Sequence, residues 1–121
     1  KGTKLRGTPC YMAPELFAAE GAVHSRASDL WALGCVLYEC ACGHPPFVSS
    51  SLTALVNAIL TQDPKPVPRA SEPFQDLLRG LLQKNPRDRL GWAGLLAHPF
   101  WQFQLPLPPL PAEPAFAAFL R

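Results

Sequence analysis

Residues 28–43, SDLWALGCVLYECACG, contain the longest nearly uninterrupted apolar run of the chain. Ser28, or a residue just before it, can cap the start of a helix, and Asp29 then falls in the first turn, where a carboxylate interacts favourably with the helix dipole. Gly43 is the expected end, because glycine readily adopts the left-handed conformation that closes helices. The run between is apolar apart from one glycine and one glutamate. We therefore predict a helix that is buried on all sides.

Shorter helices are predicted on both sides of this run. One begins near Pro14, and apolar residues recurring every three or four positions predict others over 52–60, 74–82 and 92–97. Serines precede the first two of these and are expected as caps. The stretch DPKPVP, residues 63–68, cannot be helical and predicts an extended connector. Because no alternating strand pattern occurs, the predicted fold class is mainly α.

The composition indicates a globular chain whose charge does not attract nucleic acid or anionic membranes. Of the 121 residues, 48% are hydrophobic and 17% are charged, and the net charge is +2. This balance predicts no nucleic-acid partner and no attraction to anionic membranes. The longest apolar run is also shorter than the roughly 20 residues of a membrane span. We expect neither nucleic acid nor a membrane as partner.

Cysteines and histidines show no pattern of metal ligands, so no metal site is expected. The cysteines are interpreted as reduced, apolar side chains, which favours a cytoplasmic location. The histidines are expected at the surface or as capping groups, whereas the tryptophans Trp31 and Trp92 are expected in the core. The cysteines are Cys10, Cys35, Cys40 and Cys42, and the histidines are His24, His44 and His98.

Five strings occur in order along residues 7–101: GTPCYMAPELF, SDLWALGCVLYE, GHPPF, NPRDRL and HPFW. In this order and at these distances they closely resemble the last third of a eukaryotic protein kinase domain. The resemblance implies the carboxy-terminal helical half-lobe of a protein-kinase-like fold, as an incomplete domain over residues 1–103. Residues 104–121 are expected to form a proline-rich tail or linker. Because the chain starts at Lys1 and not at methionine, the beginning of the domain is expected upstream.

The first string carries the resemblance to a substrate-binding loop. Gly7, Thr8 and Pro9 resemble the loop of serine/threonine kinases that receives the substrate residue. In that class the threonine hydroxyl bonds the catalytic aspartate and holds this base in place for the incoming hydroxyl. The alternative is a loop threonine that satisfies only local backbone groups.

Further residues resemble structural anchors of the kinase family. Ala13, Pro14 and Glu15 match the alanine-proline-glutamate signature that anchors the activation segment. In the family this glutamate pairs with an arginine near the end of the domain, and Arg89 stands at the matching position. Asp29 resembles the aspartate that supports the backbone of the catalytic loop. The alternatives are an unrelated surface glutamate and arginine, and an ordinary aspartate in a first helical turn.

The motifs that carry the chemistry of kinases do not occur in this sequence. It has no glycine-rich phosphate loop, no H-R-D string and no D-F-G string. We therefore expect no catalytic residue and no bound cofactor in this chain, and ATP and Mg²⁺ are implied only for a complete, active parent protein. The implied function is part of a kinase domain whose parent transfers the γ-phosphoryl group of ATP to serine or threonine of protein substrates. The alternative is a pseudokinase module that binds protein partners.

Within the kinase family the chain looks most like the Runkel-type proteins of plants and algae, which are relatives of the Fused and Unc-like kinases. This resemblance adds microtubules to the implied partners. The string PLPPLP, residues 106–111, also resembles ligands of polyproline-binding domains. Its flanks lack the arginine that such ligands need, so a plain linker is favoured.

Overall fold

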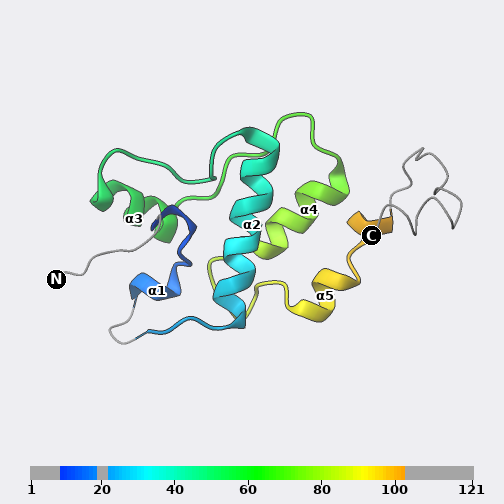
Figure 1. Ribbon diagram of the computed structural model, residues 1–121, viewed down its shortest axis with the longest axis horizontal. Coiled ribbons are helices and arrows are strands. Elements are labelled where there is room, and N and C mark those ends of the chain that lie inside the picture. The colour runs from blue at the N-terminus through cyan, green and yellow to red at the C-terminus, as the bar shows by residue number, and fades with distance from the viewer. Residues whose placement is uncertain (1–8, 19–21, 103–121) are drawn as a thin grey trace, which may run out of the picture.

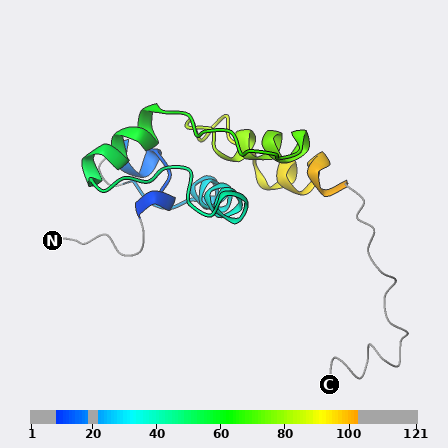
Figure 2. The ribbon, with the colours of Figure 1, turned by 90° about the horizontal axis from the view of Figure 1, so that it is seen from above.

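The computed structural model describes residues 9–18 and 22–102, in which all regular elements are helices and no strand occurs. Helix α2 lies in the middle, with α1 and α3 on one side and α4 and α5 on the other (Figure 1 and Figure 2). The predicted mainly α class is confirmed. The elements in chain order are η1 (Pro9–Tyr11), α1 (Glu15–Ala18), α2 (Arg26–Cys42), α3 (Leu52–Thr61), α4 (Glu72–Leu81), α5 (Trp92–Leu96) and η2 (Pro99–Gln102), where η denotes a 3₁₀ helix.

Helix α2 begins at Arg26, and its cap is Ser25. The hydroxyl oxygen of Ser25 accepts a hydrogen bond from the Ser28 amide at 3.2 Å, and that of Ser28 accepts one from the Ser25 amide at 2.8 Å. These reciprocal bonds form a capping box and satisfy two amides at the helix start. Ser28 is therefore the third helical residue and not the cap. Gly43 ends the helix at φ 87°, as predicted.

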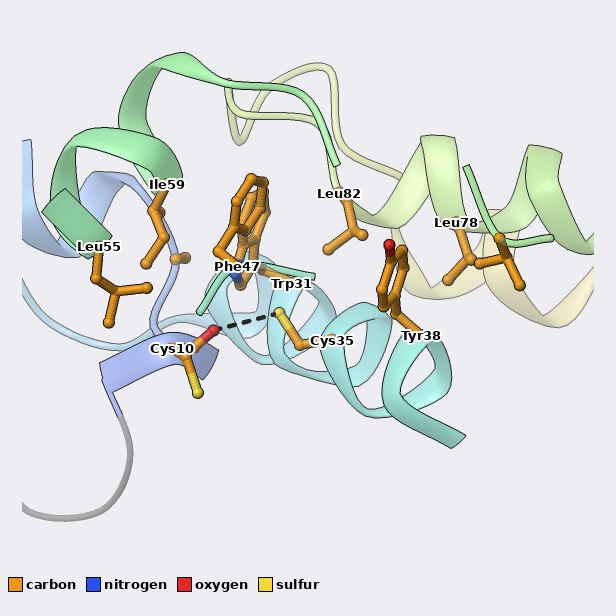
Figure 3. Packing of buried hydrophobic residues seen from close by; sticks show 11 residues of the cluster. Cys10, Trp31, Cys35, Tyr38, Phe47, Leu55, Ile59, Leu78 and Leu82 are labelled. Carbon is orange, nitrogen blue, oxygen red and sulfur yellow. Dashed lines mark hydrogen bonds between the residues drawn. The ribbon is translucent and has the colours of Figure 1, made fainter. Parts of the chain in front are cut away.

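Two faces of α2 are buried, and each contributes to a different hydrophobic cluster. Trp31, Cys35 and Tyr38 belong to a cluster with residues of η1, α3 and α4 (Figure 3). Leu30 belongs to a second cluster with Leu77, Leu81 and Leu95 of α4 and α5. The apolar circumference of α2 thus serves two packing surfaces, because helices lie on both of its sides.

The third face of α2 is exposed. Asp29, Val36 and Cys40 are all exposed there, with 47% of Val36 accessible to solvent. Nothing within residues 9–18 and 22–102 covers this face. Within the described part of the chain α2 is therefore buried on two sides and not on all, and Cys40 does not serve as a core residue.

The shorter helices begin close to the predicted positions. Ser51 caps α3 and Ser71 caps α4, since each hydroxyl oxygen accepts a hydrogen bond from the amide three residues on. Residues 62–67 have no regular structure, which confirms the connector. Helix α4 ends at Leu81, one residue before the predicted boundary at residue 82.

The expectation that both tryptophans lie in the core is half right. Trp31 is completely buried, whereas Trp92 is 45% exposed. Trp92 opens the five-residue helix α5, whose contact with the core is made by Leu95. Of the helices described, none is long and apolar enough to cross a membrane.

Candidate functional site

The guanidinium of Arg89 forms the centre of the candidate site, and the Arg89 side chain is fully buried. Its Nη1 donates to Glu15 Oε2 at 2.9 Å and its Nη2 donates to Glu15 Oε1 at 2.8 Å. This parallel pair of charge-assisted bonds is the strongest geometry available to these two side chains. The ion pair expected between Glu15 and Arg89 is therefore present, and it joins the start of α1 to the loop between α4 and α5.

The other donors of Arg89 bind backbone carbonyls. Nη1 also donates to the carbonyl of Ala27 at 2.8 Å, Nη2 to that of Lys84 at 3.2 Å, and Nε to that of Gln83 at 2.9 Å. All five N–H groups of the guanidinium are thus satisfied. Ala27 lies in the first turn of α2, so Arg89 connects α1, α2 and the end of α4.

Glu15 carries the complementary negative charge. Burial is the largest influence on this carboxyl and raises its pKa, but the bonds from Arg89 and from the backbone outweigh burial, so the pKa of Glu15 lies below its ordinary value. The Glu15 side chain keeps 23% of its surface exposed. The pair is therefore ionised at neutral pH and reaches from the core to the surface.

The other residues of the predicted anchor lie beside this pair. Ala13 and Pro14 are buried directly before α1, and their carbonyls accept hydrogen bonds from Leu16 N and Phe17 N at 3.0 Å. Pro9 starts η1. Gly7 and Thr8, predicted in the substrate-binding loop, lie outside the described residues.

Asp29 is not part of this arrangement. It lies in the first turn of α2 on the exposed face. Its carboxylate makes no hydrogen bond or ion pair within the described ranges, so it is available to a group from outside them.

A contact between Tyr11 and Glu39 could not be predicted from the sequence. The Tyr11 hydroxyl donates to Glu39 Oε1, and this bond is the main reason why the pKa of Tyr11 is raised to about 12, with burial second. Close to it, Cys35 Sγ donates to the carbonyl of Cys10 at 3.9 Å (Figure 3). Both contacts attach η1 to α2. The partners are 28 and 25 positions apart, and no local pattern links them.

Lys84 forms a second unpredicted contact, between α3 and the core. Its Nζ donates to the carbonyl of Ile59 at 2.7 Å and lies 4.7 Å from the ring centroid of Phe47. The rings of Phe47 and Trp31 stack with centroids 6.2 Å apart (Figure 3). Burial lowers the pKa of Lys84, opposed by the charge of Asp63. The ammonium thus donates a hydrogen bond to one of the last carbonyls of α3 and at the same time lies over an aromatic ring.

His98 differs from the expectation of a surface histidine, because it is buried. Its Nδ1 accepts a hydrogen bond from Phe100 N at 3.0 Å, and its Nε2 lies 2.8 Å from Asp76 Oδ2. Since Nδ1 accepts, the neutral ring carries its proton on Nε2 and donates it to Asp76. His98 does act as a capping group for the turn at η2, and it also fastens that turn to α4.

The sequence of the chain is similar to those of known proteins over most of its length. The family model "Protein kinase domain" matches residues 1–101. The chain is 52% identical over 115 residues to serine/threonine-protein kinase RUNKEL of Arabidopsis thaliana, covering 94% of this chain and 8% of that protein. It is 48% identical over 107 residues to serine/threonine-protein kinase ULK4 of Mus musculus, covering 83% of this chain and 8% of the relative.

A third relative is serine/threonine-protein kinase fused of Drosophila melanogaster, which is 41% identical over 113 residues, covering 93% of this chain and 14% of the relative. The chain therefore spans only a small part of the length of the curated relatives it matches. The resemblance stated from the five motifs is confirmed by these matches.

Proposed function

The chain belongs to the protein kinase domain family. We propose that it forms the carboxy-terminal helical part of a serine/threonine kinase domain. The longer protein that contains it is called the parent below. The parent transfers the γ-phosphoryl group of ATP to serine or threonine of protein substrates. The observation that carries this proposal is the bidentate pair of Glu15 and Arg89, which lies at the positions where the motifs of the family require it.

In this proposal the segment from Gly7 to Glu15 presents the substrate. Three contacts support it, because they hold the segment from residue 9 onward: Tyr11 to Glu39, Cys10 to Cys35, and Glu15 to Arg89. A segment fixed at three points can hold a substrate hydroxyl in one orientation, which is the main contribution that a protein makes to phosphoryl transfer. Gly7, Thr8 and Pro9 would contact the substrate residue.

Asp29 and the exposed face of α2 receive the catalytic loop of the parent in this proposal. The free carboxylate of Asp29 would accept hydrogen bonds from backbone amides of that loop. Val36 and Cys40 on the same face would then be covered by apolar residues, which removes exposed apolar surface from water.

ATP and Mg²⁺ would bind other parts of the parent. Within residues 9–18 and 22–102, no group of three or more His, Cys, Asp or Glu side chains could hold a metal ion. In this proposal the chain positions the substrate-binding segment, and other parts of the parent carry the chemistry of the phosphates.

The test is a phosphoryl-transfer assay on the purified full-length parent, with labelled ATP, Mg²⁺ and peptides that differ only in carrying serine, threonine or tyrosine. We expect label on serine and threonine peptides. Arg89→Lys should lower turnover by about a hundredfold, because loss of the bidentate geometry displaces the substrate-binding segment. Arg87→Lys, an exposed neighbour in the same loop, should leave turnover unchanged.

A folded parent that transfers no phosphoryl group to any of the peptides would contradict the proposal. Retained binding of protein partners by such a parent would support the pseudokinase alternative. If phosphoryl transfer occurs but is insensitive to Arg89→Lys, only the role given to the ion pair is contradicted, and the kinase function is not.

A further inference from the structure

A surface cavity of about 330 Å³ lies between the carboxy-terminal half of α2, helix α4 and the extended segment 62–67. None of its lining residues belongs to the Glu15–Arg89 pair or to the exposed face of α2. Its volume falls at the lower end of the range of small-molecule sites, about 300–1,000 Å³. The cavity therefore suits a ligand with one or two rings.

The floor of the cavity is apolar. Tyr38, Val67, Leu78 and Leu82 line it, and each of them is at most 6% exposed. Tyr38, Leu78 and Leu82 belong to the hydrophobic cluster around α2 (Figure 3). A ring placed on this floor would lose contact with water on the face that meets Val67, Leu78 and Leu82.

The walls of the cavity are held in place. The Tyr38 hydroxyl donates to the carbonyl of Lys65 at 2.8 Å, which fixes segment 62–67 relative to α2. Pro64 and Pro66 restrict the backbone and have no N–H group. Gln75 Nε2 donates to the carbonyl of Ala70 at 3.3 Å and fastens the end of the connector to α4. Because the cavity is already formed, its walls need not become ordered when a ligand binds, and binding avoids that free-energy cost.

The charges at the rim favour an anion. Lys65 and Arg79 line the cavity together with a single acidic residue, Asp63. Arg79 Nη2 lies 3.6 Å from Asp76 Oδ1, with both side chains more than half exposed. Such an exposed pair is weak, so Arg79 can exchange it for a ligand. Asp76 keeps a partner in His98 when Arg79 turns away.

The shape of these groups selects the kind of anion. A planar guanidinium matches a planar carboxylate through two parallel hydrogen bonds. Lys65 and Arg79 together with Asp63 carry a net charge of +1 at the rim, which a monoanion neutralises. We propose that this cavity binds small aromatic monocarboxylates, with the ring on Val67, Leu78 and Leu82 and the carboxylate bonded to Arg79 and Lys65. The proposal depends on the fold of the described residues and not on the proposed kinase function.

The first test uses the full-length parent and two probes of equal shape, 2-naphthoate and its uncharged analogue 2-naphthamide. Methyl NMR titration should show shifts at Val67, Leu78 and Leu82 with a dissociation constant on the order of 1 mM for the acid. The amide should bind about tenfold more weakly, because it lacks the charge that Arg79 bonds. Methyl groups of Leu52 and Leu60, which are exposed on α3, should not shift.

The second test compares two arginine variants of the parent. Arg79→Gln should weaken binding of 2-naphthoate about tenfold, whereas Arg87→Gln, which removes an exposed charge outside the cavity, should not change it. Equal affinity for the acid and the amide, shifts at Leu52 and Leu60 as large as those in the cavity, or an unchanged dissociation constant in Arg79→Gln would each overturn the proposal. None of these readouts involves phosphoryl transfer, so failure here is distinguishable from failure of the proposed function.

Discussion

The guanidinium of Arg89 donates to both carboxylate oxygens of Glu15 and to three backbone carbonyls. A lysine at this position could supply three donors from one atom, but not the planar fork that reaches acceptors on three segments. The identity of a single residue therefore decides whether α1, α2 and the loop after α4 stay together.

Arg89→Lys should lower the free energy of unfolding of the parent by about 3 kcal/mol, because a lysine leaves some of the five buried acceptors of Arg89 without a hydrogen bond. Chemical denaturation measures the change. Arg87→Lys serves as the control, since an exposed substitution in the same loop should stay within about 0.5 kcal/mol. A loss in Arg89→Lys no larger than in the control would show that the pair contributes nothing to stability.

The pH dependence of stability should report the ionisation of Glu15. Its pKa is lowered in the folded protein, so its contribution is fully present above the pKa of the unfolded chain, about 4.3, and is lost as the pH falls through the lower folded value. In Glu15→Gln this loss is absent. We expect the free energy of unfolding to fall less steeply below about pH 4 in Glu15→Gln than in the unchanged protein. Identical slopes would contradict the lowered pKa.

At the scale of elements, helices α2 and α4 approach closely at Gly34. A Cβ atom at this position would lie 2.9 Å from both Leu81 Cβ and Leu82 Cδ2. These leucines belong to the two clusters on either side of α2, so neither can move without disturbing a core. The absence of one methyl group thus permits the close contact between α2 and α4.

Gly34→Ala should lower the free energy of unfolding by about 1–3 kcal/mol through overpacking, although alanine is the better helix former. Thermal unfolding of the parent measures this. In Gly91→Ala, where an added Cβ meets nothing within 4 Å, only the weaker helix cap of α5 should count, and the loss should be no more than about 1 kcal/mol. A gain in stability from Gly34→Ala would mean that α2 and α4 can separate without cost.

Lys84 is one attachment of helix α3 to the rest of the fold, beside the packing of Leu55 and Ile59 into the cluster around α2. Lys84→Met keeps the apolar stem but removes the ammonium that bonds Ile59 and lies over Phe47. We expect a loss of about 1–2 kcal/mol and faster amide hydrogen exchange in α3, with exchange in α4 unchanged. Lys65→Met, at an exposed lysine, is the control. Uniform exchange rates in both variants would exclude Lys84 as an attachment.

On the scale of the whole molecule, α2 joins two hydrophobic clusters and leaves a third face uncovered by the described residues. Isolated exposed apolar residues are common in globular proteins. Here Val36 and Cys40 lie on the same face of α2 as Asp29, whose carboxylate has no partner among the described residues. The proposed function gives this face to the catalytic loop of the parent. The fold of these residues is therefore expected to depend on neighbours supplied by the parent.

The 121-residue chain expressed alone should bind a hydrophobic dye such as anilinonaphthalene sulfonate and unfold without a sharp thermal transition. The full-length parent should bind less dye per domain. In the isolated chain, Val36→Gln should reduce dye binding by lowering the apolar exposure of α2. A cooperative transition of the isolated chain with little dye bound would show that its own two clusters suffice.

Local sequence determined where the helices begin and end. Ser51, Ser71 and Gly43 were predictable because capping depends on hydrogen bonds within three or four residues and on the left-handed freedom of glycine. The connector predicted at 63–68 followed from the backbone restriction of proline. Glu15 and Arg89 were paired only through the resemblance to kinases, since nothing in their own surroundings connects positions so far apart.

Tertiary structure decided which apolar residues are buried and which polar groups meet. The bond from Lys84 to Ile59, the bond from Tyr11 to Glu39 and the pairing of His98 with Asp76 depend on how helices pack, and their partners carry no shared local pattern. The exposure of Trp92 and of Val36 likewise depends on which neighbour covers each helix face. Hydrophobicity predicts that a face can be buried, but only the arrangement of the other elements determines whether it is.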